Sequence, residues 1–140
     1  MSRWIAKTCD LETCLLLRRK VFIDEQNVPE EEEVDAFDTT AIHLLAFEGD
    51  TPVGTARIVV QGAVGKIGRV CVLPEHRGTG LGADLINEAL DQLRALPDVT
   101  TAKLGAQTQA LRFYERLGFA AYGPEYMDAG IPHKDMERRL

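Results

Sequence analysis

The chain has 140 residues, of which 45% are apolar, and 22 acidic against 16 basic side chains give a net charge of −6. A domain of this size can bury a substantial core, and the acidic balance argues against general binding to nucleic acids or anionic membranes. The three cysteines, Cys9, Cys14 and Cys71, suggest reduced thiols and a cytoplasmic protein. We expect a single domain over residues 1–140, with no signal peptide and no membrane or nucleic-acid partner.

The first third of the chain predicts a strand, a helix and a polar segment. Arg3–Thr8 alternates enough for a strand, and Asp10 can cap a helix whose apolar face runs from Leu11 to Phe22. The segment Glu25–Thr40 is polar and acidic, which predicts a loop with at most a short helix.

Two charged runs lie in this region. Arg18-Arg19-Lys20 is interpreted as a solvated helix face, and the acidic run Glu30–Glu33 with Asp35 and Asp38 as a solvated loop. The alternative for the acidic run is attraction of a cationic amine substrate.

The rest of the chain alternates strands with helices. Apolar residues at helical spacing predict a long helix from Leu81 to Leu96, which Pro97 ends, and a short helix precedes Gly118. The predicted strands are Ile42–Phe47, Val53–Val60, Lys66–Val72, Thr101–Ala106, Phe119–Tyr122 and His133–Arg138. This order suggests a mixed sheet flanked by helices.

A glycine-rich turn, Arg77–Gly82, joins the strand Lys66–Val72 to the long helix. Its free backbone N–H groups and the positive end of the helix dipole suit a phosphate or pyrophosphate. The spacing fits neither a dinucleotide fingerprint nor a nucleoside-triphosphate loop. The alternative is a turn that binds no ligand.

Two motifs in this order resemble the GNAT superfamily of N-acetyltransferases. The first is Arg-x-x-Gly-x-Gly at Arg77–Gly82, and the second comprises Ala110, Phe113, Tyr114, Gly118 and Phe119. The N-terminal stretch Arg19–Pro29, together with His43 and the segment Gly130–His133, is similar to the ElaA-like branch.

The resemblance implies an α/β (α+β) fold, with a mixed, mostly antiparallel central sheet whose middle strands splay apart. It also implies acetyl-CoA as co-substrate and no metal. The implied acetyl-CoA contacts are Val70, Cys71, Val72, Arg77, Gly78, Thr79, Gly80, Leu81, Gly82, Ala83, Gln107, Ala110 and Phe113. Gln107 stands where the family commonly has Asn, so its contact to the pantetheine arm is expected to differ.

Acyl transfer from a thioester to an amine needs a neutral amine, an oxyanion donor and a proton or hydrogen bond for the leaving thiolate. Tyr114 is the candidate general acid, with a packing aromatic as the alternative, and Glu25 is the candidate base. The acceptor is expected to contact Arg69, Glu125 and His133. Cys71 has no neighbouring residue that would support a role as nucleophile.

The function expected from the sequence is transfer of an acetyl group from acetyl-CoA to the primary amine of a small molecule, by direct attack in a ternary complex. The alternatives are acetylation of a protein lysine or N-terminus, and a non-catalytic acyl-CoA-binding module. The oligomeric state is left open between a monomer and a homodimer.

Overall fold

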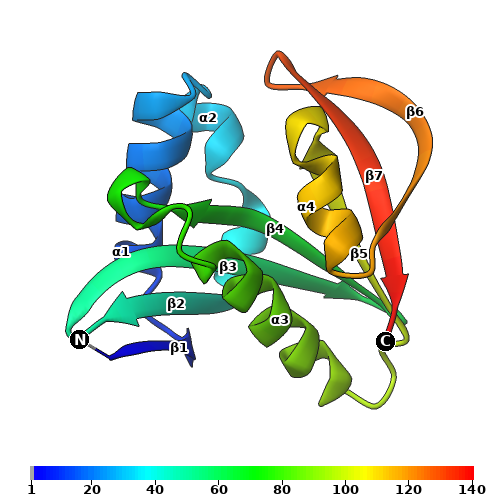
Figure 1. Ribbon diagram of the computed structural model, residues 1–140, viewed down its shortest axis with the longest axis horizontal. Helices are drawn as coiled ribbons and strands as arrows, with labels where there is room; N and C mark the ends of the chain where they lie inside the picture. The colour runs from blue at the N-terminus through cyan, green and yellow to red at the C-terminus, as the bar shows by residue number, and fades with distance from the viewer. Residues whose placement is uncertain (1) are drawn as a thin grey trace.

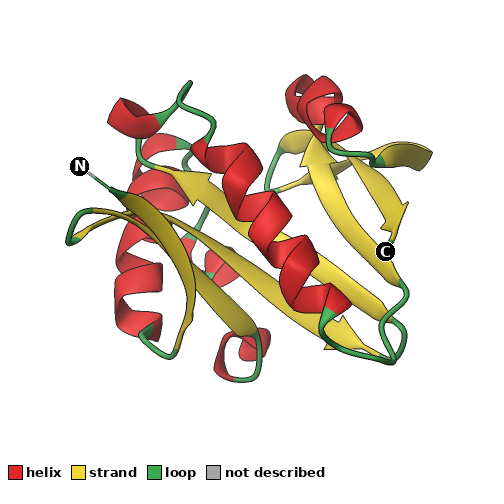
Figure 2. Cartoon of the chain, turned by 60° about the horizontal axis from the view of Figure 1, so that its bottom comes forward, coloured by secondary structure: helices red, strands yellow, loops and turns green. Residues whose placement is uncertain are grey.

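The computed structural model describes residues 2–140, which form a seven-stranded sheet with helices on both faces (Figures 1 and 2). The strands are β1 (Arg3–Thr8), β2 (Ile42–Glu48), β3 (Thr51–Gln61), β4 (Val64–Val72), β5 (Thr101–Gln107), β6 (Ala120–Asp128) and β7 (Ile131–Arg139). The α-helices are α1 (Leu11–Arg18), α2 (Glu30–Glu33), α3 (Leu81–Arg94) and α4 (Leu111–Arg116). Within residues 2–140, no helix has the length and apolar character needed to cross a membrane.

The strands lie in the order β1-β2-β3-β4-β5-β7-β6, and every neighbouring pair is antiparallel except β4 with β5. The parallel pair is short: its register joins Val64 to Thr101 and ends at Lys66 opposite Lys103. Beyond that point the two strands part, as Figure 1 shows. This confirms the predicted mixed, mostly antiparallel sheet with splayed middle strands.

Helix α1 begins where the sequence predicted it. The Asp10 carboxylate caps the helix by accepting a hydrogen bond from the Thr13 backbone N–H at 3.1 Å. After Arg18 the helix widens into a π-helical segment, η1 (Arg19–Glu25). The helix therefore continues three residues beyond the predicted end at Phe22, and Glu25 is its last residue.

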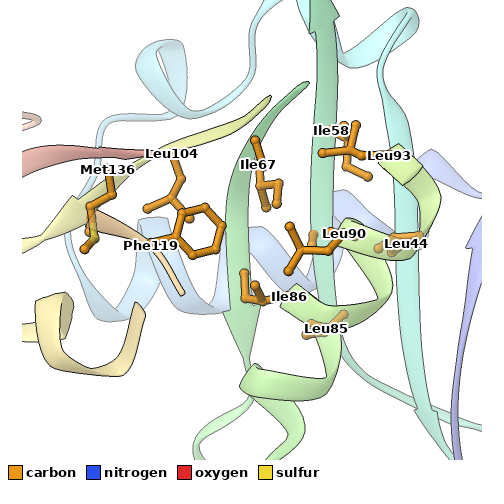
Figure 3. Close-up of a cluster of buried hydrophobic side chains, with 14 of the residues drawn as sticks. Leu44, Ile58, Ile67, Leu85, Ile86, Leu90, Leu93, Leu104, Phe119 and Met136 are labelled. Atoms are coloured by element: carbon orange, nitrogen blue, oxygen red, sulfur yellow. The ribbon is translucent and has the colours of Figure 1, made fainter. Parts of the chain in front are cut away.

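The core has two parts, one on each face of the sheet. Because successive strand residues point to opposite faces, Leu44 packs with α3 whereas Leu45 packs with α1. Figure 3 shows the larger part, in which Leu85, Ile86 and Leu90 of α3 meet the sheet. The predicted apolar stripe of this helix is confirmed, although α3 ends at Arg94, two residues short of the prediction.

The C-terminal strands are longer than predicted. Residues 123–132, expected to form a loop, belong to the β6–β7 hairpin, whose tight turn is Ala129-Gly130. The sequence misleads here because Gly123 and Pro124 usually break strands. They are tolerated because β6 is an edge strand whose pairing with β7 is irregular between Tyr122 and Tyr126.

The acidic segment, Glu25–Thr40, also differs from the prediction of a solvated loop. Arg18, Glu33 and Asp38 are 1%, 2% and 4% exposed, so neither charged run is simply solvated. Arg18 pairs with Glu33 at 3.0 Å and with Asp38 at 2.7 Å. We call the full set of paired side chains the ionic cluster: Arg18, Glu33, Asp35, Asp38, Arg57 and Arg69. Three cations thus balance three carboxylates, as burial requires.

Candidate active site

A cavity of about 330 Å³ occupies the gap between β4 and β5. Its floor is formed by β4 from Lys66 to Val70 and by Leu104, Gly105 and Gln107 of β5. One wall comes from η1 and the acidic segment, and the opposite wall comes from the β6–β7 hairpin and α4. The remaining lining residues are Phe22, Gln26, Val28, Glu32, Glu33, Ala110, Tyr114, Tyr126, Asp128, Ala129, Ile131 and His133.

The glycine-rich turn lies between the end of β4 and the start of α3. Gly78 and Gly80 have φ of +75° and +87°, a left-handed conformation that favours glycine. A Cβ at Gly78 would meet nothing within 4 Å, and one at Gly80 would meet only the Arg3 side chain at 3.9 Å. The outer side of the turn is therefore open to a ligand, next to the N-terminus of a long helix.

Arg77 fixes this turn through two contacts. Its Nε donates to the Val72 carbonyl oxygen at 2.9 Å, and its two terminal nitrogens each donate to the Glu25 carboxylate at 2.7 Å. The turn is thereby tied both to the end of β4 and to the end of η1.

Glu25 was predicted to be a base over the acceptor site, but it is held by Arg77 and is absent from the described lining of the cavity. The hydrogen bonds from Arg77 lower the pKa of Glu25, which makes its carboxylate a weaker proton acceptor. The structure favours an anchoring role for Glu25 over the predicted role as base.

Tyr114 lies on α4 and lines the cavity. Its ring packs edge-on against Phe113, with centroids 5.0 Å apart, and against Phe119 at 6.1 Å. Burial raises the pKa of Tyr114 to about 12. The phenol therefore keeps its proton and can act as a hydrogen-bond donor inside the cavity.

Strand β4 bulges at the centre of the gap. Its register with β3 shifts between the pairs Arg57–Gly68 and Thr55–Cys71, and Arg69 has a φ of +50°. The bulge directs Arg69 to the acidic wall, where its Nε donates to the Glu33 backbone oxygen at 3.1 Å. Arg69 thus both faces the cavity and pairs with acidic residues.

Two further residues of β4 differ in their surroundings. Val70 lines the cavity, whereas Cys71 is 4% exposed and packs with Cys14, Leu17 and Val21. Burial raises the pKa of the Cys71 thiol to about 12, so that it carries no thiolate at neutral pH. This agrees with the expectation that Cys71 is not a nucleophile.

The predicted contacts from the end of β5 to α4 lie in two places. Gln107 and Ala110 line the cavity, and Gln107 Nε2 donates to Gln26 Oε1 at 3.2 Å. Phe113 lies instead against the start of α3, where its ring would be 3.4 Å from a Cβ at Gly82.

Of the two acceptor contacts predicted near the hairpin, His133 and Glu125, the structure places only His133 in the described lining of the cavity. His133 lines the cavity, but Glu125 is exposed in the irregular part of β6 and is absent from the described lining. The sequence analysis missed Tyr126, whose ring stacks on His133 with centroids 5.8 Å apart. The signal was the turn at Ala129-Gly130, because a hairpin centred there sets Tyr126 opposite His133.

Comparison with known proteins gives the same picture. The family model for the acetyltransferase (GNAT) domain matches residues 5–140. YjcF of Bacillus subtilis (strain 168), described as an uncharacterized N-acetyltransferase, is 39% identical, with 97% of this chain and 98% of that protein covered. Protein ElaA of Escherichia coli (strain K12) is 34% identical, with 93% of this chain and 88% of ElaA covered.

Solved structures agree in fold. An acyl-CoA N-acyltransferase from Pseudomonas aeruginosa is 31% identical with a TM-score of 0.86, and 98% of each chain is covered. The crystal structure of Escherichia coli ElaA is also 31% identical, with a TM-score of 0.84 and the same coverage. The chain therefore belongs to the GNAT acetyltransferase family and is an acyltransferase. Within that family it lies in the ElaA-like branch.

Proposed function

We propose that this acyltransferase moves an acetyl group from acetyl-CoA to the primary amine of a small molecule by direct attack in a ternary complex. The observation that carries the proposal is the gap between β4 and β5. The cavity in this gap is bounded by two walls, and the open glycine-rich turn follows the end of β4.

The proposed seat of acetyl-CoA follows the gap. The pyrophosphate would lie on the turn Gly78–Ala83, where backbone N–H groups and the helix dipole favour an anion. The pantetheine arm would run along the backbone of Val70–Val72 in the manner of an added strand. Gln107, Ala110 and Phe113 would flank it from the side of β5 and α4.

The proposed chemistry uses groups already in the gap. The neutral amine attacks the thioester carbonyl, and a backbone N–H near Val72 stabilises the oxyanion that forms. When the tetrahedral intermediate collapses, the carbon–sulfur bond breaks. The Tyr114 hydroxyl then donates a hydrogen bond to the departing thiolate.

A small acceptor fits this site better than a protein side chain, because a protein acceptor would need an open groove. The acidic segment contributes Glu32 and Glu33 to the cavity, and the hairpin contributes Asp128 and Ile131 from the opposite side. The two walls thus enclose the place where a protein segment would have to lie. The carboxylates of Glu32 and Asp128, both exposed, would favour a cationic amine.

The test has two arms. Calorimetry should show binding of CoA and acetyl-CoA, and thiol release from acetyl-CoA should exceed hydrolysis with at least one member of a primary-amine panel. Lysine-bearing peptides in parallel test the protein-acceptor alternative. Transfer to peptides with none to small amines would overturn the proposed acceptor class, and failure to bind acetyl-CoA would overturn the proposed cofactor seat.

A further inference from the structure

We infer that the Nε2 atom of His133 is the base that removes the proton from the acceptor ammonium. The inference rests on the function proposed above and assigns the proton acceptor at the same site. It depends on three features: the state in which the ring is held, the support behind the ring, and the fate of the other bases around the cavity.

The first feature is a hydrogen bond that sets the tautomer. His133 Nδ1 lies 2.7 Å from the backbone oxygen of Ile131. A carbonyl oxygen can only accept, so Nδ1 must carry the proton and donate it. In the neutral ring Nε2 is then left with its lone pair, and within residues 2–140 no hydrogen-bond partner of Nε2 is found.

The second feature is the support that keeps the ring in place. Tyr126 stacks on the imidazole at an interplanar angle of 24°, and its hydroxyl donates to the Asp135 carboxylate at 2.8 Å. Gly105 makes room for this arrangement, because a Cβ there would lie 2.5 Å from the Tyr126 hydroxyl oxygen. The imidazole is thus held by a stacked ring that is itself anchored to Asp135.

The third feature is that nearby candidate bases are engaged or exposed. Glu33 is held by Arg18 and Arg69, and Glu25 by Arg77. Glu32 and Asp128 remain, but both are exposed at the rim and solvated. The other two histidines are occupied elsewhere, His43 by the Asp38 backbone oxygen and His76 by Glu48.

The proton transfers then balance. His133 Nε2 takes one proton from the ammonium, and the freed lone pair attacks the thioester carbon. The resulting intermediate still carries a positively charged nitrogen. As the carbon–sulfur bond breaks, that nitrogen loses its second proton and the thiolate gains one, with Tyr114 assisting by its hydrogen bond. The imidazolium returns its proton to water, and amide and free CoA are the products.

The first experiment follows the rate of acetyl transfer to an alkylamine that the wild type accepts. His133→Gln should lower the single-turnover rate about 100- to 10,000-fold at neutral pH, with little change in acetyl-CoA affinity. The residual rate should rise about tenfold per pH unit below the pKa of the free amine, because only amine already neutral in solution reacts. The wild type should show a flatter dependence.

Control variants distinguish the loss of a base from the loss of a residue that only supports the cavity wall. The charged and titratable side chains that line the cavity with His133 or support its ring are Tyr126, Asp135, Asp128, Glu32, Glu33, Lys66, Arg69 and Tyr114. Asp128→Asn is therefore measured alongside. Glu137→Gln removes an exposed carboxylate of the same strand, outside the cavity lining, and should leave the rate unchanged. A pH-independent loss in His133→Gln, or a larger loss in Asp128→Asn, would overturn the inference.

The second experiment needs acetyl-CoA but no acceptor. Nitrogen-15 NMR of the acetyl-CoA complex under mildly alkaline conditions should show the proton of His133 on Nδ1 and a bare Nε2. His43 serves as an internal reference, because its Nε2 lies 2.8 Å from a carbonyl and must carry the proton. A proton on Nε2 of His133 would overturn the inference. If the wild type binds acetyl-CoA but accepts no amine, the proposed acceptor class fails while this spectrum still decides the state of His133.

Discussion

At the scale of single residues, burial determines what Tyr114 can contribute. Its pKa of about 12 lies well above that of an ordinary thiol, near 8.5, so full proton transfer to the thiolate is uphill. A neutral phenol can still donate a hydrogen bond, and in a cavity such a bond is stronger than in water. The role that fits Tyr114 is therefore that of a donor, supported by the edge-on packing of Phe113 and Phe119.

Tyr114→Phe removes the donor and keeps the ring. We expect single-turnover transfer to fall by roughly ten- to a thousandfold, with acetyl-CoA affinity nearly unchanged. The pH profile of the variant should keep the wild-type shape across the neutral range, because the phenol with its pKa of about 12 does not titrate there. Equal rates would leave Tyr114 as a packing residue.

Gly80 tests the cofactor seat. Gly80→Glu places a carboxylate beside the proposed pyrophosphate and forces a side chain into a backbone with φ of +87°. CoA affinity should fall at least tenfold, whereas Gly80→Ala carries the same backbone strain without the charge and should lose less. Calorimetry on both variants, with thermal melting to confirm folding, makes the comparison. Unchanged affinity in a folded Gly80→Glu protein would remove the pyrophosphate from this turn.

At the scale of elements, the ionic cluster holds the acidic segment against α1, β3 and β4. The Arg69 side chain forms a salt bridge with Glu33 and donates a hydrogen bond to the Glu32 backbone oxygen at 3.2 Å. These contacts attach the bulge of β4 to one wall of the cavity. Burial would raise the pKa of Asp38, but hydrogen bonds from Arg18, the Asp35 backbone and Arg57 outweigh it and hold that pKa well below its usual range.

This shift predicts how stability depends on pH. Because the folded-state pKa of Asp38 is depressed, its contribution is present above the unfolded-state value of about 3.9 and is lost as the pH falls below it. Asp38→Asn should cost about 3–5 kcal/mol near neutral pH, since Arg18 and Arg57 each lose one of their two carboxylate partners in a buried setting. The variant should also lose less stability than the wild type on acidification. Urea unfolding at several pH values measures both effects, and parallel acid limbs would contradict the assignment.

The sequence was informative wherever a local pattern decides the structure. The cap at Asp10, the apolar stripe of α3 and the turn at Gly80 were all readable from neighbouring residues. It failed where distant partners decide. The residues next to Arg18 in the sequence do not indicate that it is buried in a pairing with Glu33 and Asp38. Glu25 and its partner Arg77 are 52 positions apart in the sequence.

At the scale of the whole molecule, two sides of the sheet serve different parts of the proposed reaction. In the proposed function, the glycine-rich turn and α3 would bind acetyl-CoA, and the acidic segment with the hairpin would enclose the acceptor. The two meet where β4 and β5 separate, so the short parallel register that ends at Lys66 and Lys103 determines where the gap begins.

Gly68 offers a way to block the acceptor side alone. It lines the cavity, its φ is not in the left-handed region, and a Cβ there would meet nothing within 4 Å. Gly68→Leu should therefore fold normally, fill part of the cavity and lower amine turnover at least tenfold, while CoA affinity stays within a few-fold of the wild type. Gly68→Ala is the matched control with a smaller expected loss. Undiminished turnover in Gly68→Leu would place the acceptor elsewhere.

The contact between Glu25 and Arg77 also bears on which anions the protein admits. Because both terminal nitrogens of Arg77 already donate to the Glu25 carboxylate, its guanidinium is less available to an inorganic phosphate ion at the turn. A ligand that also binds the backbone of the turn and the gap between β4 and β5 can compete with Glu25 for Arg77, whereas a free phosphate ion cannot. Glu25→Gln should then make inorganic phosphate a several-fold stronger competitor of CoA in calorimetric displacement. If phosphate competes equally in both proteins, Glu25 is an anchor of η1 and has no part in ligand selectivity.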